Sequence, residues 1–261
     1  MEVDVSKFYV GQDGGRYCSV CGEPKFCKIN FRGKELTVGC MCKCENERLK
    51  ADEDRDIADA KRQKRERCFK DKKCYEWTFD NDDKANEKVS AALRRYVKDF
   101  EEHKANGQGL LLWGRVGSGK SFLAGCVANA VIDEGYSALM TDFPTIINRL
   151  QANFDNKQEI IDMLNRYALL VIDDLGVERN SEYVREQVYN IINARYKAKL
   201  PMVITTNLPL EEIARPKDIE FARVYERILE RCHPVEMNQV NRRRQGLNEK
   251  YRQMQAKLFG S

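Results

Sequence analysis

Short apolar runs alternate with longer amphipathic stretches from about residue 75 onward. The runs have the length and continuity of parallel strands that are buried on both faces. They cover residues 109–113, 137–141, 168–173, 201–206 and 233–238. Because parallel strands need a crossover connection, usually a helix, this alternation predicts an α/β domain with a five-stranded parallel sheet.

Residues 143–166, between the second and third predicted strands, are longer than one crossover helix requires. Apolar side chains recur there at helical spacing, at Ile146, Ile147, Leu150 and Phe154. We therefore predict two helices in this segment, one of them additional to the simplest α/β unit.

The two ends of the chain differ in composition from this predicted domain. Residues 45–67 carry acids before bases and few apolar side chains, an order that complements a helix dipole. We predict a solvated connecting helix there; a basic stripe that binds nucleic acid is the alternative. The predicted organisation is a small module over residues 1–44, a charged linker over 45–74, the α/β domain over 75–244 and one short tail helix over 245–261.

Cysteines concentrate near the N-terminus, where six of the ten fall between Cys18 and Cys44. A closely spaced pair followed by Gly22 has the form of a metal-binding knuckle, and a second group follows about twenty residues later. Four thiolates at this spacing suit tetrahedral Zn²⁺ in a structural site, and metal binding would supply folding free energy to so small a segment. Unligated thiols and an iron–sulfur cluster are the alternatives. The predicted ligands are Cys18, Cys21, Cys42 and Cys44, with Cys40 as the substitute.

The composition argues against some classes of protein. Lys and Arg outnumber Asp and Glu by 45 to 41, and a net charge of +4 gives no strong field toward nucleic acid. No apolar stretch reaches the roughly 18 residues that a membrane-spanning helix needs, and the N-terminus lacks the order of a secretion signal. We therefore expect a cytoplasmic protein without a membrane partner, whose cysteines are reduced thiols or metal ligands.

Residues 114–121 form the pattern Gly-x-x-x-x-Gly-Lys-Ser between the first predicted strand and a predicted helix over 122–130. Free backbone amides and the helix dipole make such a turn a phosphate site, so we predict a bound nucleoside triphosphate. Lys120 is expected to reach the β- and γ-phosphates, and Ser121 to hold Mg²⁺. A chance glycine-rich turn is the alternative. The predicted binding residues are Gly114, Gly117, Ser118, Gly119, Lys120, Ser121 and Phe122.

Two acids end the third predicted strand, and an amide follows the fourth. The carboxyl ends of strands in open α/β sheets line the ligand crevice, so these side chains are candidates for the same site. We expect Asp173 to hold Mg²⁺ and Asp174 to polarise an attacking water, with a plain surface turn as the alternative. Asn207 is expected to sense the γ-phosphate or position the water. Trp77 and Phe79 are candidates for contact with the base.

Three motifs with their flanks, residues 111–124, 171–179 and 203–208, resemble those of bacterial and phage replicative helicase loaders of the DnaC/DnaI type. The resemblance runs from about Tyr75 to Arg244. It implies an AAA+ ATPase that binds ATP and Mg²⁺ and hydrolyses ATP. It also implies that the N-terminal module docks a hexameric replicative DNA helicase, which the protein loads onto single-stranded DNA during replication initiation.

The same resemblance implies roles for three arginines. Arg227 aligns with the arginine finger that completes the ATP site of a neighbouring subunit, which implies ATP-dependent self-association. A plain surface charge is the alternative for this residue. Arg242, or its neighbour Arg243, falls where the family carries its second sensor arginine, and the choice among Arg242, Arg243 and Arg244 stays open.

The segment over 143–166 resembles the helical insertion with which related ATPases grip single-stranded DNA. Phe154 would stack a base there, and Ser181 and Tyr183 match a position that touches the phosphodiester backbone. Packing within the core is the alternative for both aromatic residues. Many relatives carry Glu in place of Asp174, and the shorter side chain here implies slow hydrolysis, which suits a switch better than a motor.

Other classes of protein remain as alternatives. A transposition helper ATPase of the IstB type shares these motifs but acts on duplex DNA. In a third class, ATP would be only a structural ligand of a binding module. A motor helicase is disfavoured, because the chain lacks a set of helicase motifs.

Overall fold

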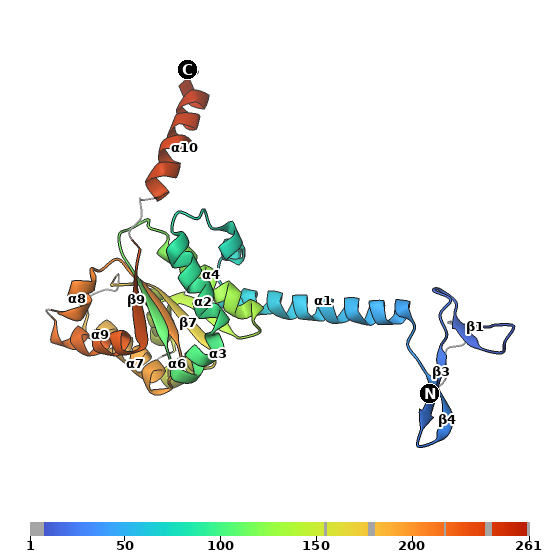
Figure 1. Cartoon of the computed structure of the whole chain (residues 1–261). Coiled ribbons are helices and arrows are strands. Elements are labelled where there is room, and N and C mark those ends of the chain that lie inside the picture. The colour runs from blue at the N-terminus through green and yellow to red at the C-terminus, as the bar shows by residue number, and fades with distance from the viewer. Residues whose placement is uncertain (1–7, 154–155, 177–180, 217, 238–241, 260–261) are drawn as a thin grey trace. The chain divides into compact units, whose positions relative to one another are not determined.

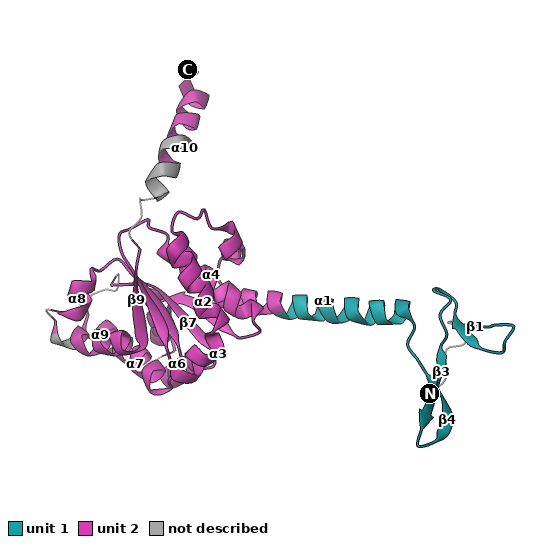
Figure 2. Cartoon of the chain, viewed as in Figure 1, with its two compact units in different colours: residues 1–60 teal, residues 61–261 magenta. Residues whose placement is uncertain are grey.

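The computed structural model describes residues 8–153, 156–176, 181–216, 218–237 and 242–259. Its contacts divide the chain into two units, residues 1–60 and 61–261 (Figure 2). Helix α1 (Lys43–Cys68) contributes residues to both units. The four-part organisation inferred from composition stays a prediction.

The first unit is built from two antiparallel ladders and the start of α1 (Figure 1). β1 (Phe8–Val10) pairs with β2 (Arg16–Cys18), and β3 (Phe26–Phe31) pairs with β4 (Lys34–Gly39). Among the hydrophobic residues described in this unit, only Cys18 and Cys42 are buried. Because two-stranded ladders with so little buried apolar surface are unstable in water, this unit needs another source of stability.

The second unit contains the predicted parallel sheet, with strand order β6-β7-β8-β5-β9 (Figure 1). Its strands are β5 (Gly109–Trp113), β6 (Ala138–Asp142), β7 (Leu169–Leu175), β8 (Met202–Thr206) and β9 (Cys232–Glu236). The α/β fold class is thus confirmed. β7 runs further than predicted, because its pairing with β8 shifts register between Ile172 and Leu175 and then resumes.

Helices cover both faces of the sheet. Successive side chains of a strand point to opposite faces, so each apolar strand needs a hydrophobic partner on both sides. Leu110 and Leu112 belong to one hydrophobic cluster, and Leu111 belongs to the other. The first face carries η2 (Lys72–Glu76), η3 (Phe79–Asn81), α2 (Glu87–Lys98), α3 (Phe100–Asn106) and α4 (Lys120–Asp133). The second carries α5 (Phe143–Ala152), α6 (Lys157–Asn165), α7 (Glu182–Lys197), α8 (Leu210–Ala214) and α9 (Ile219–Arg231). α5 and α6 are the two helices predicted within residues 143–166.

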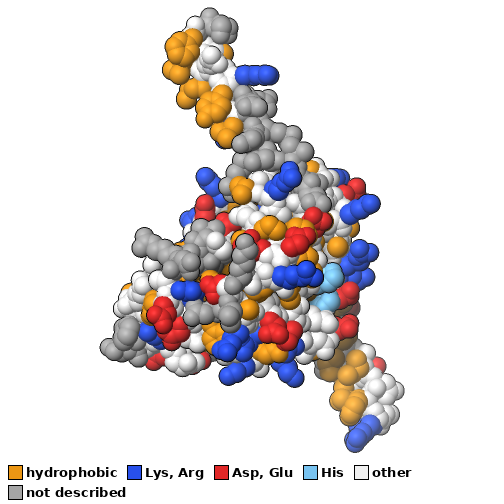
Figure 3. Space-filling view, turned by 90° about the vertical axis from the view of Figure 1, so that its left-hand side faces the viewer, with side chains coloured by type: hydrophobic (Ala, Val, Ile, Leu, Met, Phe, Trp, Pro, Cys, Tyr) orange, Lys and Arg blue, Asp and Glu red, His pale blue; other side chains and the backbone are white. Residues whose placement is uncertain are grey.

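The last helix, α10 (Arg242–Phe259), begins before the predicted tail boundary at residue 245 and is longer than expected. Its large apolar side chains among the described residues are exposed (Figure 3); they are Leu247, Tyr251, Met254, Leu258 and Phe259. Within the described ranges, no helix combines the length and apolar character needed to cross a bilayer.

Arg195 of α7 ties the amino ends of β7 and β8 together. Its side chain is fully buried, and its guanidinium donates hydrogen bonds of 2.8–3.2 Å to four carbonyl oxygens. Those carbonyls belong to Leu164, Tyr167, Ala168 and Pro201, at the end of α6 and just before the two strands. The four acceptors offset part of the cost of burying this charge.

Replacing Arg195 with Met should destabilise the second unit by about 3 kcal/mol or more, because several buried carbonyls would lose their donor. Urea unfolding of the two variants Arg195→Met and Lys197→Met, compared with the wild type, measures the effect. Lys197 is exposed on the same helix, so its replacement should change the free energy of unfolding by no more than about 0.5 kcal/mol. Equal effects of the two substitutions would contradict the structural role of Arg195.

Candidate nucleotide site and metal centre

The carboxyl ends of β7, β8 and β5 are neighbours in the sheet and open onto a cleft of about 380 Å³. In open parallel sheets this edge is where ligands bind. The described lining residues are Trp77, Val116, Gly117, Gly119, Lys120, Ser121, Phe122, Asp174 and Asn207. The structure therefore brings most of the predicted nucleotide-binding residues into one cavity.

Two glycines of the phosphate loop have a backbone geometry that other residues would not adopt. Gly119 precedes α4 with φ of +92°, in the left-handed region that side chains disfavour. A Cβ on Gly114 would lie 2.5 Å from the carbonyl oxygen of Met237, so only glycine fits there. α4 begins at Lys120, directly after the loop, so the free amides of its first turn face the cleft region.

The Lys120 ammonium is buried and fully engaged with oxygen atoms. It donates at 2.9 Å to the carbonyls of Gly114 and Arg115 and at 2.8 Å to Asn207 Oδ1. The last contact joins the phosphate loop to the end of β8. The amide after the fourth predicted strand thus contacts the lysine of the phosphate loop, as their shared sheet edge implied.

Asp173 lies in a mostly buried position beside Ser121 and Thr205. Thr205 Oγ1 donates to Asp173 Oδ1 at 2.6 Å. Burial raises the pKa of Asp173 above its ordinary value, and the charges of Asp174 and Asp142 act in the same direction. Hydrogen bonds from Thr205 and Ser121 oppose this shift. An oxygen cluster of carboxylate and hydroxyl groups suits Mg²⁺, which prefers hard oxygen ligands.

Asp174 has a backbone conformation that few residues other than glycine adopt. Its φ is +55°, at the register shift of β7, and its amide donates to Thr205 Oγ1 at 2.8 Å. The Asn207 amide donates to Asp174 Oδ1 at 3.4 Å. Strain of this kind persists only where the surroundings impose it, and it is common at functional sites. Thr205, which contacts both acids, was missed by sequence reasoning; its place on β8, two residues before Asn207, was the available signal.

The two aromatic candidates for base contact are separated by the fold. Trp77 lines the cleft and packs 6.1 Å from the ring of Phe122. Phe79 is buried in the core, with the Arg94 guanidinium 4.9 Å from its ring, and is not among the described lining residues. The candidacy of Phe79 is therefore wrong, because its side chain faces the core.

Several residues implied by resemblance lie away from the cleft. Arg227 is on α9, where Nη2 donates to the Tyr189 hydroxyl at 3.1 Å and the guanidinium stacks on the Tyr189 ring. Ser181 caps α7 by accepting from the Val184 amide, and the half-buried Tyr183 packs against the core with Lys157 over its ring. Phe154 and the side chains of Arg242 and Arg243 lie outside the described residues. All of these roles stay predictions.

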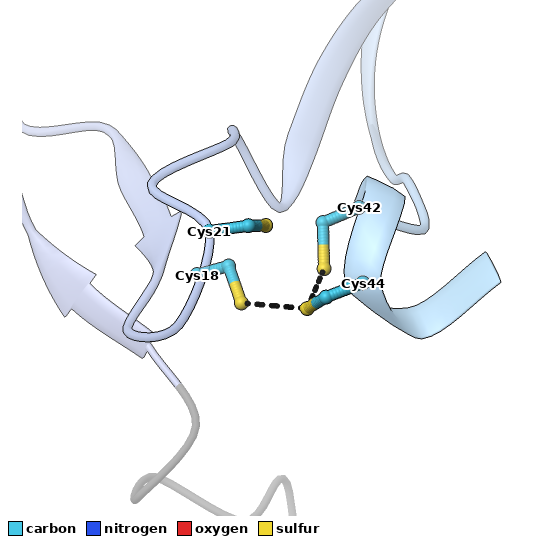
Figure 4. A group of neighbouring side chains, drawn as sticks. All are labelled: Cys18, Cys21, Cys42 and Cys44. Atoms are coloured by element: carbon cyan, nitrogen blue, oxygen red, sulfur yellow. Dashed lines mark hydrogen bonds between the residues drawn. The ribbon is translucent and has the colours of Figure 1, made fainter. Parts of the chain in front are cut away.

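Four cysteines of the first unit face one another (Figure 4). Cys18 ends β2 and Cys21 lies in the turn after it, whereas Cys42 directly precedes α1 and Cys44 lies in its first turn. Their sulfur atoms all lie within 4.8 Å of one another, with 3.5 Å between Cys18 and Cys44. In tetrahedral zinc sites with bonds of about 2.3 Å the sulfurs are about 3.8 Å apart, so the four thiols fit a zinc ion closely.

Position distinguishes the members of the sulfur cluster from Cys40. Within the cluster, backbone amides of Cys21 and Val20 lower the pKa of the Cys18 thiol to about 6, whereas hydrogen bonds with Cys42 and Cys18 raise the pKa of Cys44. Cys40 instead donates to the carbonyl of Pro24 at 3.3 Å and is not part of the group. Of the five candidate ligands, the four preferred ones converge and Cys40 lies outside their group; their role as zinc ligands stays a prediction.

Comparison with known protein families identifies an ATP-binding family, in agreement with the phosphate loop and the cleft. The chain belongs to the family of IstB-like ATP binding proteins, which matches residues 35–249. The five-stranded parallel sheet with its phosphate loop is that of an AAA+ P-loop NTPase.

Individual relatives include two proteins named replicative helicase loaders. The chain is 26% identical to DnaI of Bacillus subtilis (strain 168) over 58% of its own length and 54% of that protein. It is 29% identical to DnaC of Escherichia coli (strain K12) over 47% of its length and 50% of that protein. A protein of Sinorhizobium fredii described as an insertion sequence ATP-binding protein is 28% identical over 62% of the chain and 55% of that protein.

A solved structure gives the same match. The crystal structure of the DnaC helicase loader superimposes with a TM-score of 0.56 at 26% identity, over 64% of this chain and 100% of that one. The chain spans about half the length of the curated relatives it matches.

Asp173→Asn should raise the melting temperature of the ligand-free protein, because a neutral amide in this position does not carry the cost of burying a charge. The raised pKa means that ionised Asp173 costs folding free energy at neutral pH, and this cost disappears as the pH falls through that pKa. The advantage of the variant should therefore shrink toward about pH 4. Thermal melts with and without Mg²⁺ and ATP test this, since the ligands should stabilise the wild type more than Asp173→Asn.

Zinc content separates the predicted ligands from the excluded one. The wild type and Cys40→Ser should each retain one zinc ion per chain, whereas Cys42→Ser should lose most of it. Metal analysis of the purified full-length proteins, with amide hydrogen exchange of residues 8–44, measures both binding and folding. Loss of zinc from Cys40→Ser would show that the ligand set is wrong.

Proposed function

We propose that this protein is an ATP-switched loader of the replicative DNA helicase. The observation that carries the proposal is the convergence of the phosphate loop, Asp174 and Asn207 at one cleft, in a chain whose relatives are named helicase loaders. The first unit, residues 1–60, contains the four converging cysteines and is called the cysteine unit below; it would supply a surface for a protein partner. ATP binding and hydrolysis would change DNA engagement and release the helicase.

The nucleotide chemistry follows from the cleft. Phosphate oxygens would join or replace the oxygens that now surround Lys120, which lets its charge stabilise the β- and γ-phosphates. Ser121 and Asp173 would hold Mg²⁺, which supplies neutralisation of phosphate charge. Asp174 accepts a hydrogen bond from the attacking water, and Asn207, in contact with both Lys120 and Asp174, orients it.

Hydrolysis should be slow in the isolated chain, because Arg227, which is implied to complete the site, is not among the described residues that line the cleft. Arg227 would act on the ATP site of a neighbouring subunit, which makes hydrolysis dependent on self-association. Its present partners on α7, the Tyr189 hydroxyl and ring, hold it half-buried until such a neighbour binds. Arg242 or Arg243 would contact the γ-phosphate within the same subunit.

The two other partners are assigned to different parts of the chain. The cysteine unit would dock the helicase, with zinc held by Cys18, Cys21, Cys42 and Cys44. Loading would take place in the cytoplasm. Single-stranded DNA would contact the insertion formed by α5 and α6, with Phe154, and the start of α7, with Ser181 and Tyr183. Base stacking of this kind contributes about 1–3 kcal/mol per base.

A second candidate function is a transposition helper that assembles on duplex DNA. It is favoured by the similarity to the insertion sequence ATP-binding protein of Sinorhizobium fredii. The cysteine unit argues against it, because Cys18 and Cys21 precede residues 35–249, the part that the family matches. The two functions differ in the DNA they require.

A loading assay tests the proposal with the full-length protein. The replicative helicase of the same cell, ATP and this protein are incubated with circular single-stranded DNA or circular duplex DNA, and DNA-bound helicase is counted. We expect at least tenfold more helicase on single-stranded circles with the wild type than with Lys120→Ala, because the variant lacks the phosphate-binding charge. Lys98→Ala, which removes an exposed lysine on α2, is the matched control and should load normally. Assembly on duplex circles without helicase loading would favour the second function.

A further inference from the structure

The nucleotide cleft has two chemically distinct parts. Asn207 contacts both Lys120 and Asp174, and the three side chains form a polar part suited to phosphate. Trp77, Val116 and Phe122 line the same cleft with apolar surface. A nucleoside triphosphate has the same division, since its phosphates are charged and its base is flat and largely apolar. The indole of Trp77 is the largest planar group among the lining residues, and it is half-buried rather than sealed in the core.

The packing of Trp77 is determined by helix α4, which carries the phosphate loop at its start. A Cβ on Gly125 would lie 2.4 Å from Trp77 Cε3, so the indole lies directly against the helix backbone. Phe122 packs on the same indole at 6.1 Å with an interplanar angle of 58°. Trp77 is therefore fixed to the helix that begins with Lys120 and Ser121.

Asn129 of α4 secures the segment that carries Trp77. Its Nδ2 donates to the carbonyl of Trp77 at 2.9 Å and to that of Cys74 at 2.8 Å. Its Oδ1 accepts from Arg65 Nε of α1 at 3.0 Å, and its side chain is only 1% exposed. One buried amide thus uses both donor hydrogens on the aromatic segment and its acceptor on α1.

Arg65 makes this contact part of a larger attachment of α1 to α4. Its Nη2 donates to Asp133 at 2.6 Å, and Lys61 lies 3.9 Å from the same carboxylate. The last turns of α1 and the aromatic segment are consequently bound to opposite sides of one side chain. A displacement of Trp77 is resisted by Asn129, and Asn129 is held in turn by α1.

We propose that Trp77 stacks on the base of the bound nucleoside triphosphate, and that Asn129 is the positioning residue that holds it there and connects it to α1. This inference rests on the proposed ATP binding. It adds a base contact and a route by which the occupied cleft stiffens the end of α1. Inorganic tripolyphosphate has the phosphates without the base, so it distinguishes phosphate binding from base stacking on Trp77.

The first experiment compares the affinities of the full-length protein for ATP and for tripolyphosphate, both with Mg²⁺. Trp77→Ala should weaken ATP binding about 10- to 100-fold and leave tripolyphosphate binding unchanged, whereas Trp77→Phe should retain most of the ATP affinity. Equal losses for both ligands, or unchanged ATP affinity, would overturn the base contact. Failure of the wild type to bind either ligand would instead refute the proposed function.

Asn129→Asp tests the positioning role, because the carboxylate still accepts from Arg65 but donates to neither carbonyl. It should weaken ATP binding about 10-fold without affecting tripolyphosphate. Gly125→Ala provides a second variant in case Asn129→Asp does not fold, because the added methyl displaces the indole while favouring the helix. A merely structural role for these residues would lower both affinities together, which would contradict the proposal.

Tryptophan fluorescence and amide hydrogen exchange complete the test. The chain has two tryptophans, so Trp113→Phe leaves Trp77 as the remaining indole; its emission should change with ATP and not with tripolyphosphate. In the wild type, ATP but not tripolyphosphate should slow amide hydrogen exchange in residues 61–68, and Asn129→Asp should abolish that difference. An identical response to ATP and tripolyphosphate in either measurement would contradict the proposal that a base bound at Trp77 stiffens the end of α1.

Discussion

The side-by-side alignment of β7, β8 and β5 is the constraint on which the nucleotide cleft depends. Because these strands are parallel neighbours, their carboxyl ends bring the phosphate loop, two acids and Asn207 to one edge. At the opposite ends of β7 and β8, buried Arg195 binds the preceding carbonyls and holds the strands in place. The alignment of these strands thus accounts both for the nucleotide cleft at their carboxyl ends and for the contacts of buried Arg195 at their amino ends.

The cleft concentrates polar groups that lower stability in the absence of a ligand. Lys120 is buried among oxygen acceptors, and burial raises the pKa of Asp173, so its ionised form costs folding free energy at neutral pH. Asp174 adds a left-handed backbone conformation at the register shift of β7. These costs are of the kind that a cation and phosphates offset, which makes ligand binding and stability interdependent.

The cysteine unit follows a different physical rule from the ATPase unit. Its short ladders bury almost no apolar surface among the described residues, so four converging thiols are its main source of cohesion when they hold a metal. The family match begins at residue 35, after Cys18 and Cys21. The family match therefore covers most of the ATPase unit but only residues 35–60 of the first unit, and the partner of the first unit has to be argued from the chemistry of this chain.

The sequence by itself determined the features that depend on local pattern: the five strands, the phosphate loop, the paired acids and the four spaced cysteines. Continuous apolar runs and fixed ligand spacings act over a few residues and survive without knowledge of the fold. Tertiary structure alone decided that Thr205 joins Asp173 to Asp174, that Trp77 and not Phe79 reaches the cleft, and that Cys40 turns to Pro24. It also assigned Arg195 and Asn129, since their partners are backbone carbonyls or side chains from distant segments. Such contacts depend on which elements become neighbours, and that is set by the packing of the whole sheet and its helices.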